Sequence, residues 1–294
     1  SEIDKILKNK SEITKIVVAD LEALSENFGD KRRSEIIKDS VDVEFNEEDY
    51  VVQEDVYAIV TKDGWVKRIR QNNDVTGTRI REGDIILDAH ALSTLDSVLF
   101  FTNLGNLYIL KTKDFPASSG FGDPLSKLLK FKDGEKVVKS FASPSSKDKG
   151  GLQEGMNLTL LTKDGVGFAL TMTEFSGIKR NGRRAIKLRE ADQLVAVMEL
   201  SNLTGMATRK GFGLIIEKKD IPVRDSAAVG VQLIKVGSED EVIAMFGKPE
   251  KGVINLDMAS GRTKEVTWND ITVGHRALKG NKIVSQGEII GVNQ

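Results

Sequence analysis

A short pattern of apolar strand, polar turn and second strand recurs along the chain. Clear copies lie at 56–70 (VYAIVTKDGWVKRIR), 98–111 (VLFFTNLGNLYILK) and 158–171 (LTLLTKDGVGFALT), with weaker copies at 203–217 and 253–267. Each turn ends in a glycine, about 41 to 60 residues from the next; the five are Gly64, Gly105, Gly165, Gly211 and Gly261. A hairpin repeated at a period near 50 residues is typical of a radial or stacked β array.

The connectors between these hairpins carry strand patterns of their own. Segments 128–141, 185–200 and 230–246 each contain an apolar strand, an acidic or glycine-bearing turn and another apolar strand, and 79–89 and 282–292 are shorter versions. Each unit therefore holds about four strands, which is the content of one propeller blade. We predict an all-β, propeller-like fold of five, at most six, four-stranded blades over residues 51–294.

The first 40 residues have a different period. Ile13, Val17, Leu21, Leu24 and Phe28 follow one another at steps of three and four, which predicts an amphipathic helix. Ser11 is a candidate cap for this helix, and Gly29 suits a left-handed residue at its end. Residues 41–50 are polar and acidic and are predicted to be a linker into the β domain.

Composition narrows the class of protein. The chain has 294 residues, of which 39% are hydrophobic and 30% charged, its net charge is −1, and it has no cysteine. No run approaches the about 20 apolar residues that cross a bilayer, so no membrane contact is expected. The lack of cysteine excludes disulfides and agrees with a reducing cytoplasm. The chain starts with Ser and lacks a secretory signal pattern, and we expect a piece of a longer cytoplasmic protein.

Residue patterns for catalysis or metal binding are missing from the sequence. His90 and His275 are its two histidines, and both are expected to be structural or exposed. No nucleophile elbow, P-loop or complete dinucleotide fingerprint occurs. The acidic runs Glu47-Glu48 and Glu239-Asp240-Glu241 are interpreted as solvated turns. We therefore predict no catalytic residue, no metal and no cofactor in this piece.

Basic residues gather after the hairpins and in the connectors, and they are the candidate contacts to nucleic acid. In 179–189 (KRNGRRAIKLR) six cations occur with no acid among them, and an arginine pair there is suited to straddling phosphates. The candidates are Lys67, Arg68, Arg70, Arg79, Arg81, Lys111, Lys113, Lys179, Arg180, Arg183, Arg184, Lys187, Arg209, Lys210, Lys218, Lys219, Arg262, Lys264 and Arg276.

These basic sets recur at similar phases of the repeat, so a propeller would place them at similar heights around its rim. The alternative is an ordinary solvated surface in which acids are interspersed. Aromatic residues do not interleave with the cations, which disfavours base stacking and favours contact along the backbone of double-stranded DNA.

The order of these segments resembles the C-terminal β-pinwheel of the A subunit of bacterial type IIA topoisomerases, meaning gyrase and topoisomerase IV. TKDGWVKRI and TNLGNLYILKTKDFP are similar to the first and second blades, and LTKDGVGFALTMTEF followed by NGRRAIKL is similar to the third. Residues 1–37, with the string GDKRRS, resemble the last helix of the breakage–reunion core and its exit.

The resemblance implies a disc with a basic rim that binds and bends duplex DNA. It also implies that the cleavage tyrosine lies in the upstream core, so this piece itself would not cut DNA, whereas the parent protein would be an ATP-dependent topoisomerase. The implied partners are double-stranded DNA, the breakage–reunion core of the same polypeptide and the ATPase B subunit.

Gyrases of this family carry a box of the form QRRGGKG after the first blade. The matching positions here are Gln71 to Thr78 (QNNDVTGT), which lack its arginines. Five hairpins and a net charge near zero also favour a topoisomerase IV-like subunit that guides the transported duplex for decatenation and relaxation. A gyrase A subunit with a degenerate box, a propeller scaffold for protein contacts, and a propeller enzyme with a site in its central channel remain alternatives.

Overall fold

The computed structural model describes residues 2–30, 52–71, 74–145, 151–173, 178 and 180–293. The chain divides into two compact units, Ser1–Asn46 and Glu47–Gln294. The predicted linker at 41–50 lies outside the described residues. No helix in the described part is long and apolar enough to cross a membrane.

The first unit contains two helices, α1 (Glu2–Lys8) and α2 (Lys10–Phe28). The cap of α2 is Asn9, whose side chain accepts a hydrogen bond from the Ser11 backbone N–H at 3.1 Å, so the proposed cap at Ser11 is wrong by two residues. Gly29 has an extended backbone with φ −67°, not the left-handed conformation expected from the sequence. The apolar stripe from Ile13 to Phe28 is exposed.

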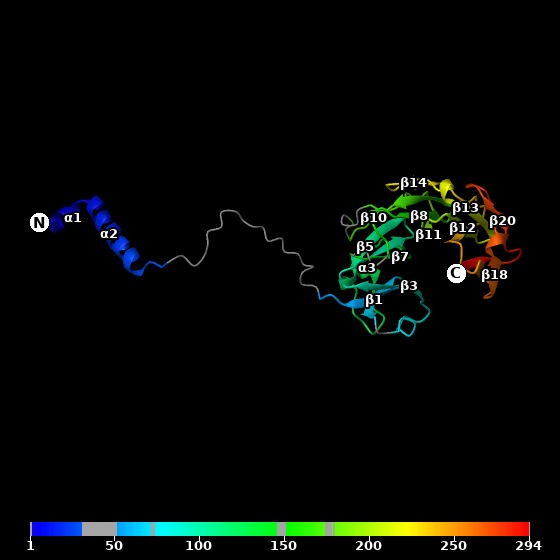
Figure 1. Cartoon of the computed structure of the whole chain (residues 1–294), viewed down its shortest axis with the longest axis horizontal. Helices are drawn as coiled ribbons and strands as arrows, with labels where there is room; N and C mark the ends of the chain where they lie inside the picture. The colour runs from blue at the N-terminus through cyan, green and yellow to red at the C-terminus, as the bar shows by residue number, and fades with distance from the viewer. Residues whose placement is uncertain are drawn as a thin grey trace. The chain divides into compact units, whose positions relative to one another are not determined.

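The second unit is a five-bladed all-β propeller, which confirms the predicted fold class; Figure 1 shows its sheets following one another from β1 to β18. The five hairpins are β1 (Asp55–Thr61) with β2 (Trp65–Arg70), β4 (Ser97–Thr102) with β5 (Asn106–Lys111), β8 (Asn157–Thr162) with β9 (Val166–Thr171), β12 (Leu203–Thr208) with β13 (Phe212–Glu217), and β17 (Val253–Met258) with β18 (Thr263–Thr267).

A third strand pairs with the first strand of every hairpin. These third strands are β3 (Ile86–Ser93), β7 (Val137–Ser143), β11 (Leu194–Glu199), β16 (Val242–Phe246) and β21 (Ile289–Asn293). They contact one another in succession from β3 to β21, so they form the inner side of the array.

The fourth strands are short and lie at the opposite edge of each sheet, which we call the outer edge. They are β6 (Asp123–Pro124) on the first sheet, β10 (Arg183–Arg184) on the second, β14 (Val223–Arg224) and β15 (Val231–Gln232) on the third, and β19 (Val273–Gly274) and β20 (Asn281–Lys282) on the fourth. The fifth sheet has three strands in the described part of the chain.

Each fourth strand belongs in sequence to the following unit. The segment with β6 comes after the second hairpin but pairs with β2 of the first sheet, and β10 comes after the third hairpin but pairs with β5 of the second. The prediction that each unit supplies four strands to its own blade is therefore corrected: three strands stay and the fourth joins the preceding blade. Consecutive sheets are tied together by the chain itself.

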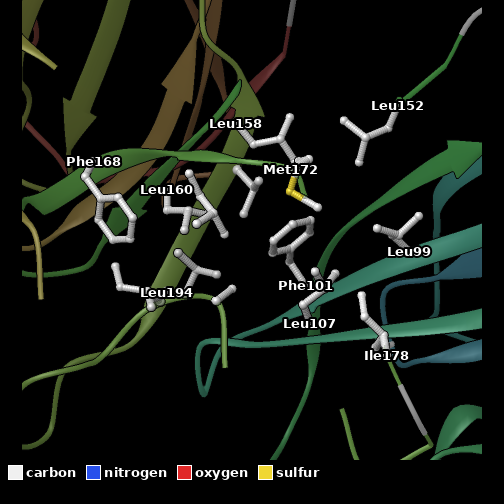
Figure 2. Close-up of a cluster of buried hydrophobic side chains, with 14 residues drawn as sticks. Leu99, Phe101, Leu107, Leu152, Leu158, Leu160, Phe168, Met172, Ile178 and Leu194 are labelled. Carbon is white, nitrogen blue, oxygen red and sulfur yellow. The ribbon is translucent and has the colours of Figure 1, made fainter. Parts of the chain in front are cut away.

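Four hydrophobic cores lie between neighbouring sheets. Between the second and third sheets, Leu99, Phe101 and Leu107 meet Leu160 and Phe168, all fully buried. Figure 2 shows these side chains directed toward one another, with Met172 beside Phe101. Strands with apolar residues on both faces therefore fill two cores at once, which explains the continuous apolar runs of the hairpins.

The fifth sheet ends this succession. In β17, Ile254 and Leu256 face the core shared with the fourth sheet, so the alternating residues Asn255 and Asp257 point to the other face. The corresponding residues of the second sheet are Leu99 and Phe101. A polar face of this kind suits a terminal repeat, because such a face is in contact with water.

Candidate nucleic-acid interface

The most basic part of the outer edge is the segment Arg180–Arg189 on the second sheet, which we call the outer basic segment. Its strand β10 pairs Arg183 with Leu107 and Arg184 with Asn106. The next two residues, Ala185 and Ile186, are buried in the core between the second and third sheets. Arg180, Arg184, Lys187 and Arg189 are exposed, and Arg183 is half-buried.

The local backbone requires a glycine just before the arginines. Gly182 has φ 72°, and a Cβ there would lie 2.6 Å from the Tyr108 ring. The chain therefore passes close to the second sheet at Gly182. Beyond it, buried apolar residues hold the segment to the core, and exposed cations lie before and after them. This is why Asn181-Gly182-Arg183-Arg184 presents its guanidinium groups at the outer edge rather than within a core.

Lys67 is a buried residue and not a surface contact, which corrects its place among the candidates. Its side chain is 1% exposed, and its ammonium donates hydrogen bonds to the carbonyl oxygens of Arg79 and Gly120 at 2.5 and 2.7 Å. Burial lowers the pKa of Lys67. Its cation joins two connectors to the first sheet and is not available to a phosphate.

The other candidate cations of the first two units lie near strand ends, some at one end of the strands and some at the other. Arg70, Arg79 and Arg81 are exposed, and the Arg81 guanidinium lies 4.9 Å from the Trp65 ring centroid. Arg68 and Lys113 line a cavity of about 380 Å³ together with Glu54 and Asp114, so its charge is mixed. Lys111 and Lys113 are half-buried.

Acids accompany the basic set of the fourth unit. Arg209 forms an ion pair with Glu241, Lys219 pairs with Glu217, and the Lys210 ammonium lies 3.4 Å from the Glu239 carboxylate. This set matches the alternative of a solvated surface with mixed charge. Lys218 of the same unit is exposed.

The candidates of the fifth unit are Arg262, Lys264 and Arg276, all exposed. The Lys264 ammonium donates a hydrogen bond to the Ile283 carbonyl oxygen at 3.1 Å, which ties it to the outer edge of the fourth sheet. Lys179 lies outside the described residues, as do Asn72 and Asn73 of the segment that matches the gyrase box.

The basic sets do not share one height, contrary to the expectation from their phase in the repeat. Arg209, Lys210 and Arg262 are at hairpin turns, whereas Lys111, Lys113 and Lys218 are at the opposite end of the hairpins. Arg183 and Arg184 are on the outer edge between these ends. The outer edge of the second sheet is therefore the place where the largest number of exposed candidates lies on one short stretch of chain.

Two aromatic side chains missed by the sequence reasoning lie beside cations. Besides Trp65 with Arg81, the Phe212 ring has the ammonium groups of Lys279 and Lys282 at 3.8 and 5.0 Å from its centroid. Aromatic rings and cations are therefore neighbours in the folded chain, and the expectation from the sequence that they do not interleave is wrong. One sequence signal for the cations beside Phe212 was available, because Gly280-Asn281-Lys282 has the same spacing as Gly182-Arg183-Arg184.

The two histidines have different surroundings. His90 on β3 lies 2.9 Å from the Ser140 hydroxyl of β7, and that hydroxyl donates to the Asp88 carboxylate at 2.8 Å. Exposed His275 lies 3.5 Å from the Asp220 carboxylate. Within the described ranges no group of three or more His, Cys, Asp or Glu side chains is placed to hold a metal.

Comparison with known proteins identifies this arrangement. The family model described as "DNA gyrase C-terminal domain, beta-propeller" matches residues 96–143, 157–201 and 206–246. The DNA gyrase A subunit of Haloquadratum walsbyi is 30% identical over 258 residues, an alignment covering 83% of this chain and 29% of that protein. The chain therefore spans about three tenths of the length of this curated relative.

Solved structures agree on the fold. The C-terminal domain of DNA topoisomerase IV superposes with a TM-score of 0.72 at 20% identity, covering 83% of this chain and 78% of that one. The DNA gyrase A C-terminal domain gives a TM-score of 0.60 at 21% identity, covering 82% of each chain.

Strand exchange between consecutive blades and basic residues on the outer edge define the protein as a β-pinwheel. More particularly, the chain belongs to the C-terminal domains of type IIA topoisomerase A subunits.

Proposed function

We propose that the second unit binds duplex DNA along its outer edge and bends it, without reading base sequence. The observation that carries this proposal is the outer basic segment, where Arg180, Arg184, Lys187 and Arg189 are exposed on one short stretch. Arginine is suited to phosphate because its planar guanidinium offers two parallel donors. Membership of a topoisomerase family supports DNA as the polyanion.

The binding energy in this proposal comes from counterion release. Each phosphate neutralised by a Lys or Arg releases condensed cations from the duplex, so affinity falls with salt by a slope of about 0.9 per contact on logarithmic axes. A net charge of −1 for the whole chain is compatible with this, because binding depends on where the cations gather and not on their sum.

Bending follows from holding a stiff duplex against a curved edge. Bending a site of 20 to 30 base pairs costs on the order of 1–6 kcal/mol, which added phosphate contacts offset. In the parent protein, the bent segment would be presented to the breakage–reunion core as the transported duplex, and ATP hydrolysis by the B subunit would drive its passage. Cleavage would take place in the core, and the parent protein would act in the cytoplasm.

Between the two members of the family, we infer a topoisomerase IV-like subunit. Five blades, the missing arginines at Gln71 to Thr78 and the low net charge favour a domain that guides DNA without a tight wrap. The gyrase alternative is supported by the names of the curated relatives. ATP-dependent assays of the parent enzyme separate the two, since decatenation without negative supercoiling is expected here and supercoiling would assign a gyrase.

The DNA-binding proposal is tested by fluorescence anisotropy of a duplex of about 40 base pairs at about 50 and 200 mM salt. We expect the double substitution Arg183→Glu and Arg184→Glu to weaken binding and to flatten the salt slope by at least about 0.9, since Arg184 is the exposed member of the pair. Lys248→Glu with Lys251→Glu is the matched control, because both lysines lie away from the outer basic segment.

Unchanged binding of the Arg183 and Arg184 variant at low salt would remove the outer basic segment from the interface. If the unmodified chain binds no duplex at either salt concentration, the propeller is instead a scaffold for protein contacts.

A further inference from the structure

The fourth strands of the first four sheets occupy the same register, which allows their side chains to be compared position by position. In each sheet one fourth-strand residue lies opposite the residue that follows the turn glycine of the hairpin. The pairs are Pro124 with Trp65, Arg184 with Asn106, Gln232 with Val166 and Lys282 with Phe212.

Two of these four equivalent positions carry an exposed cation and two do not. Arg184 on the second sheet and Lys282 on the fourth are exposed. Gln232 on the third sheet is used internally, since its amide donates to the carbonyl oxygens of Asp164 and Ile234, both at 2.7 Å. Pro124 has no side-chain donor. At this register positive charge therefore alternates from sheet to sheet, whereas β14, the other fourth strand of the third sheet, carries the exposed Arg224 at a different register.

The fourth sheet gathers more than one cation at this point. The Lys279 ammonium is 3.8 Å and the Lys282 ammonium 5.0 Å from the centroid of the same Phe212 ring. In the described part of the chain neither ammonium forms an ion pair with a carboxylate. Two like charges held at one ring repel each other, so an anion placed between them is stabilised by both.

The backbone presents the two cationic edges in the same way. Gly182 and Gly280 have φ 72° and 76°, and each passes so close to its sheet that a Cβ would collide with it. The residues that follow are anchored alike, with Ile186 in one core and Ile283 in another. Arg184 and Lys282 therefore project from equivalent points of sheets that are two blades apart.

We propose that one duplex is held at two separate points of the outer edge, by Arg184 on the second sheet and by Lys279 with Lys282 on the fourth. The duplex would cross the third sheet without a phosphate contact at the equivalent residue, Gln232. This inference rests on the proposed DNA binding and assigns a second contact site to it.

A two-point grip makes affinity depend on duplex length, because the second contact becomes intramolecular once the duplex reaches it. We measure anisotropy with a series of duplexes from about 10 to 40 base pairs. The unmodified chain is expected to show a step in affinity at one length. Arg184→Gln and Lys279→Gln with Lys282→Gln should each abolish this step and reduce the salt slope, by about 0.9 and 1.8 respectively.

Two controls separate charge from folding. Lys279→Arg with Lys282→Arg should retain the step, and Lys248→Gln with Lys251→Gln should leave both step and slope unchanged. If the unmodified chain binds DNA with a steep salt slope but the Lys279 and Lys282 glutamine variant keeps the same step and slope, the second contact site is refuted while DNA binding stands. If the unmodified chain binds no duplex, the proposed function itself fails.

Discussion

Lys67 shows how a single cation can be held inside a β sheet. Its ammonium is desolvated, but two carbonyl oxygens from connectors 12 and 53 residues away accept its hydrogen bonds. A buried charge is tolerated only when such partners replace water. The neighbouring residues Trp65 to Arg70 carry no sign of this, because the partners come from distant loops without a recognisable pattern.

Replacing Lys67 by Met is expected to destabilise the fold without affecting DNA binding. The two carbonyl oxygens lose their donor, which costs about 1–3 kcal/mol of unfolding free energy. Urea denaturation measures this cost, and Lys62→Met at the exposed neighbouring turn serves as the control. A reduced salt slope for duplex binding by the Lys67 variant would contradict the structural role given to this residue.

His90 makes stability depend on pH. Burial lowers the pKa of His90, Asp88 opposes this effect by raising it, and Lys139 lowers it further. The ordinary pKa of histidine is about 6.5, so below that pH the unfolded chain takes up a proton that the folded chain resists. Stability contributed by the neutral ring is therefore present above about pH 6.5 and is lost as the pH falls.

The substitution His90→Gln should remove this dependence while keeping a donor for Ser140. We expect the urea midpoint of the unmodified chain to fall more between about pH 7 and 5 than that of the variant. Equal pH profiles for the His90 variant and the unmodified chain would show that this histidine does not control the transition.

At the scale of elements, the hairpins were predictable and the exchanged strands were not. Strands such as Val98–Phe101 are apolar on both faces and are followed by a turn glycine, and both signals are local. The fourth strands have only two residues each, too few for a period to appear. Their pairing with the preceding blade depends on apolar anchors that are far away in sequence, such as Ile186 in a core with Phe101.

The candidate site was predictable to a similar degree. The cluster of cations at Arg180 to Arg189 was found because it is contiguous in sequence, and it lies at the outer edge. The pairing of Arg209 with Glu241 and the meeting of Lys279 with Phe212 join residues 32 and 67 positions apart, which a single sequence does not reveal.

The exchanged strands depend on glycines at close approaches to the receiving sheet. Gly280 has φ 76°, and a Cβ there would lie 2.0 Å from the Gly213 carbonyl oxygen, whereas Gly261 has φ 78° with open space around it. Gly261→Ala should cost about 1–2 kcal/mol from backbone strain alone. Gly280→Ala should cost a further 1–3 kcal/mol or so, because the fourth strand must move away from its sheet.

Thermal or urea denaturation of the two glycine variants compares these costs directly. Similar losses of stability for both would show that the close approach of the fourth strand contributes little to holding the blades together.

At the scale of the whole molecule, the proposed function depends on which surfaces of the five sheets are left free by packing. Apolar faces join the first four sheets to their neighbours, and the polar face formed by Asn255 and Asp257 ends the series. The inner strands are occupied by contacts with one another. The outer edge is thus left to interact with other molecules, and at the register of Arg184 and Lys282 it carries exposed cations on the second and fourth sheets.

The shape of a bound duplex tests bending along the outer edge most directly. A duplex of about 25 base pairs, labelled at its two ends, is mixed with the chain at low salt, and energy transfer between the ends is measured. We predict that transfer increases on binding and that it returns toward the value of free DNA with Arg184→Gln or with Lys279→Gln and Lys282→Gln. A duplex that is bound by the unmodified chain but shows no change in transfer would contradict bending along this edge.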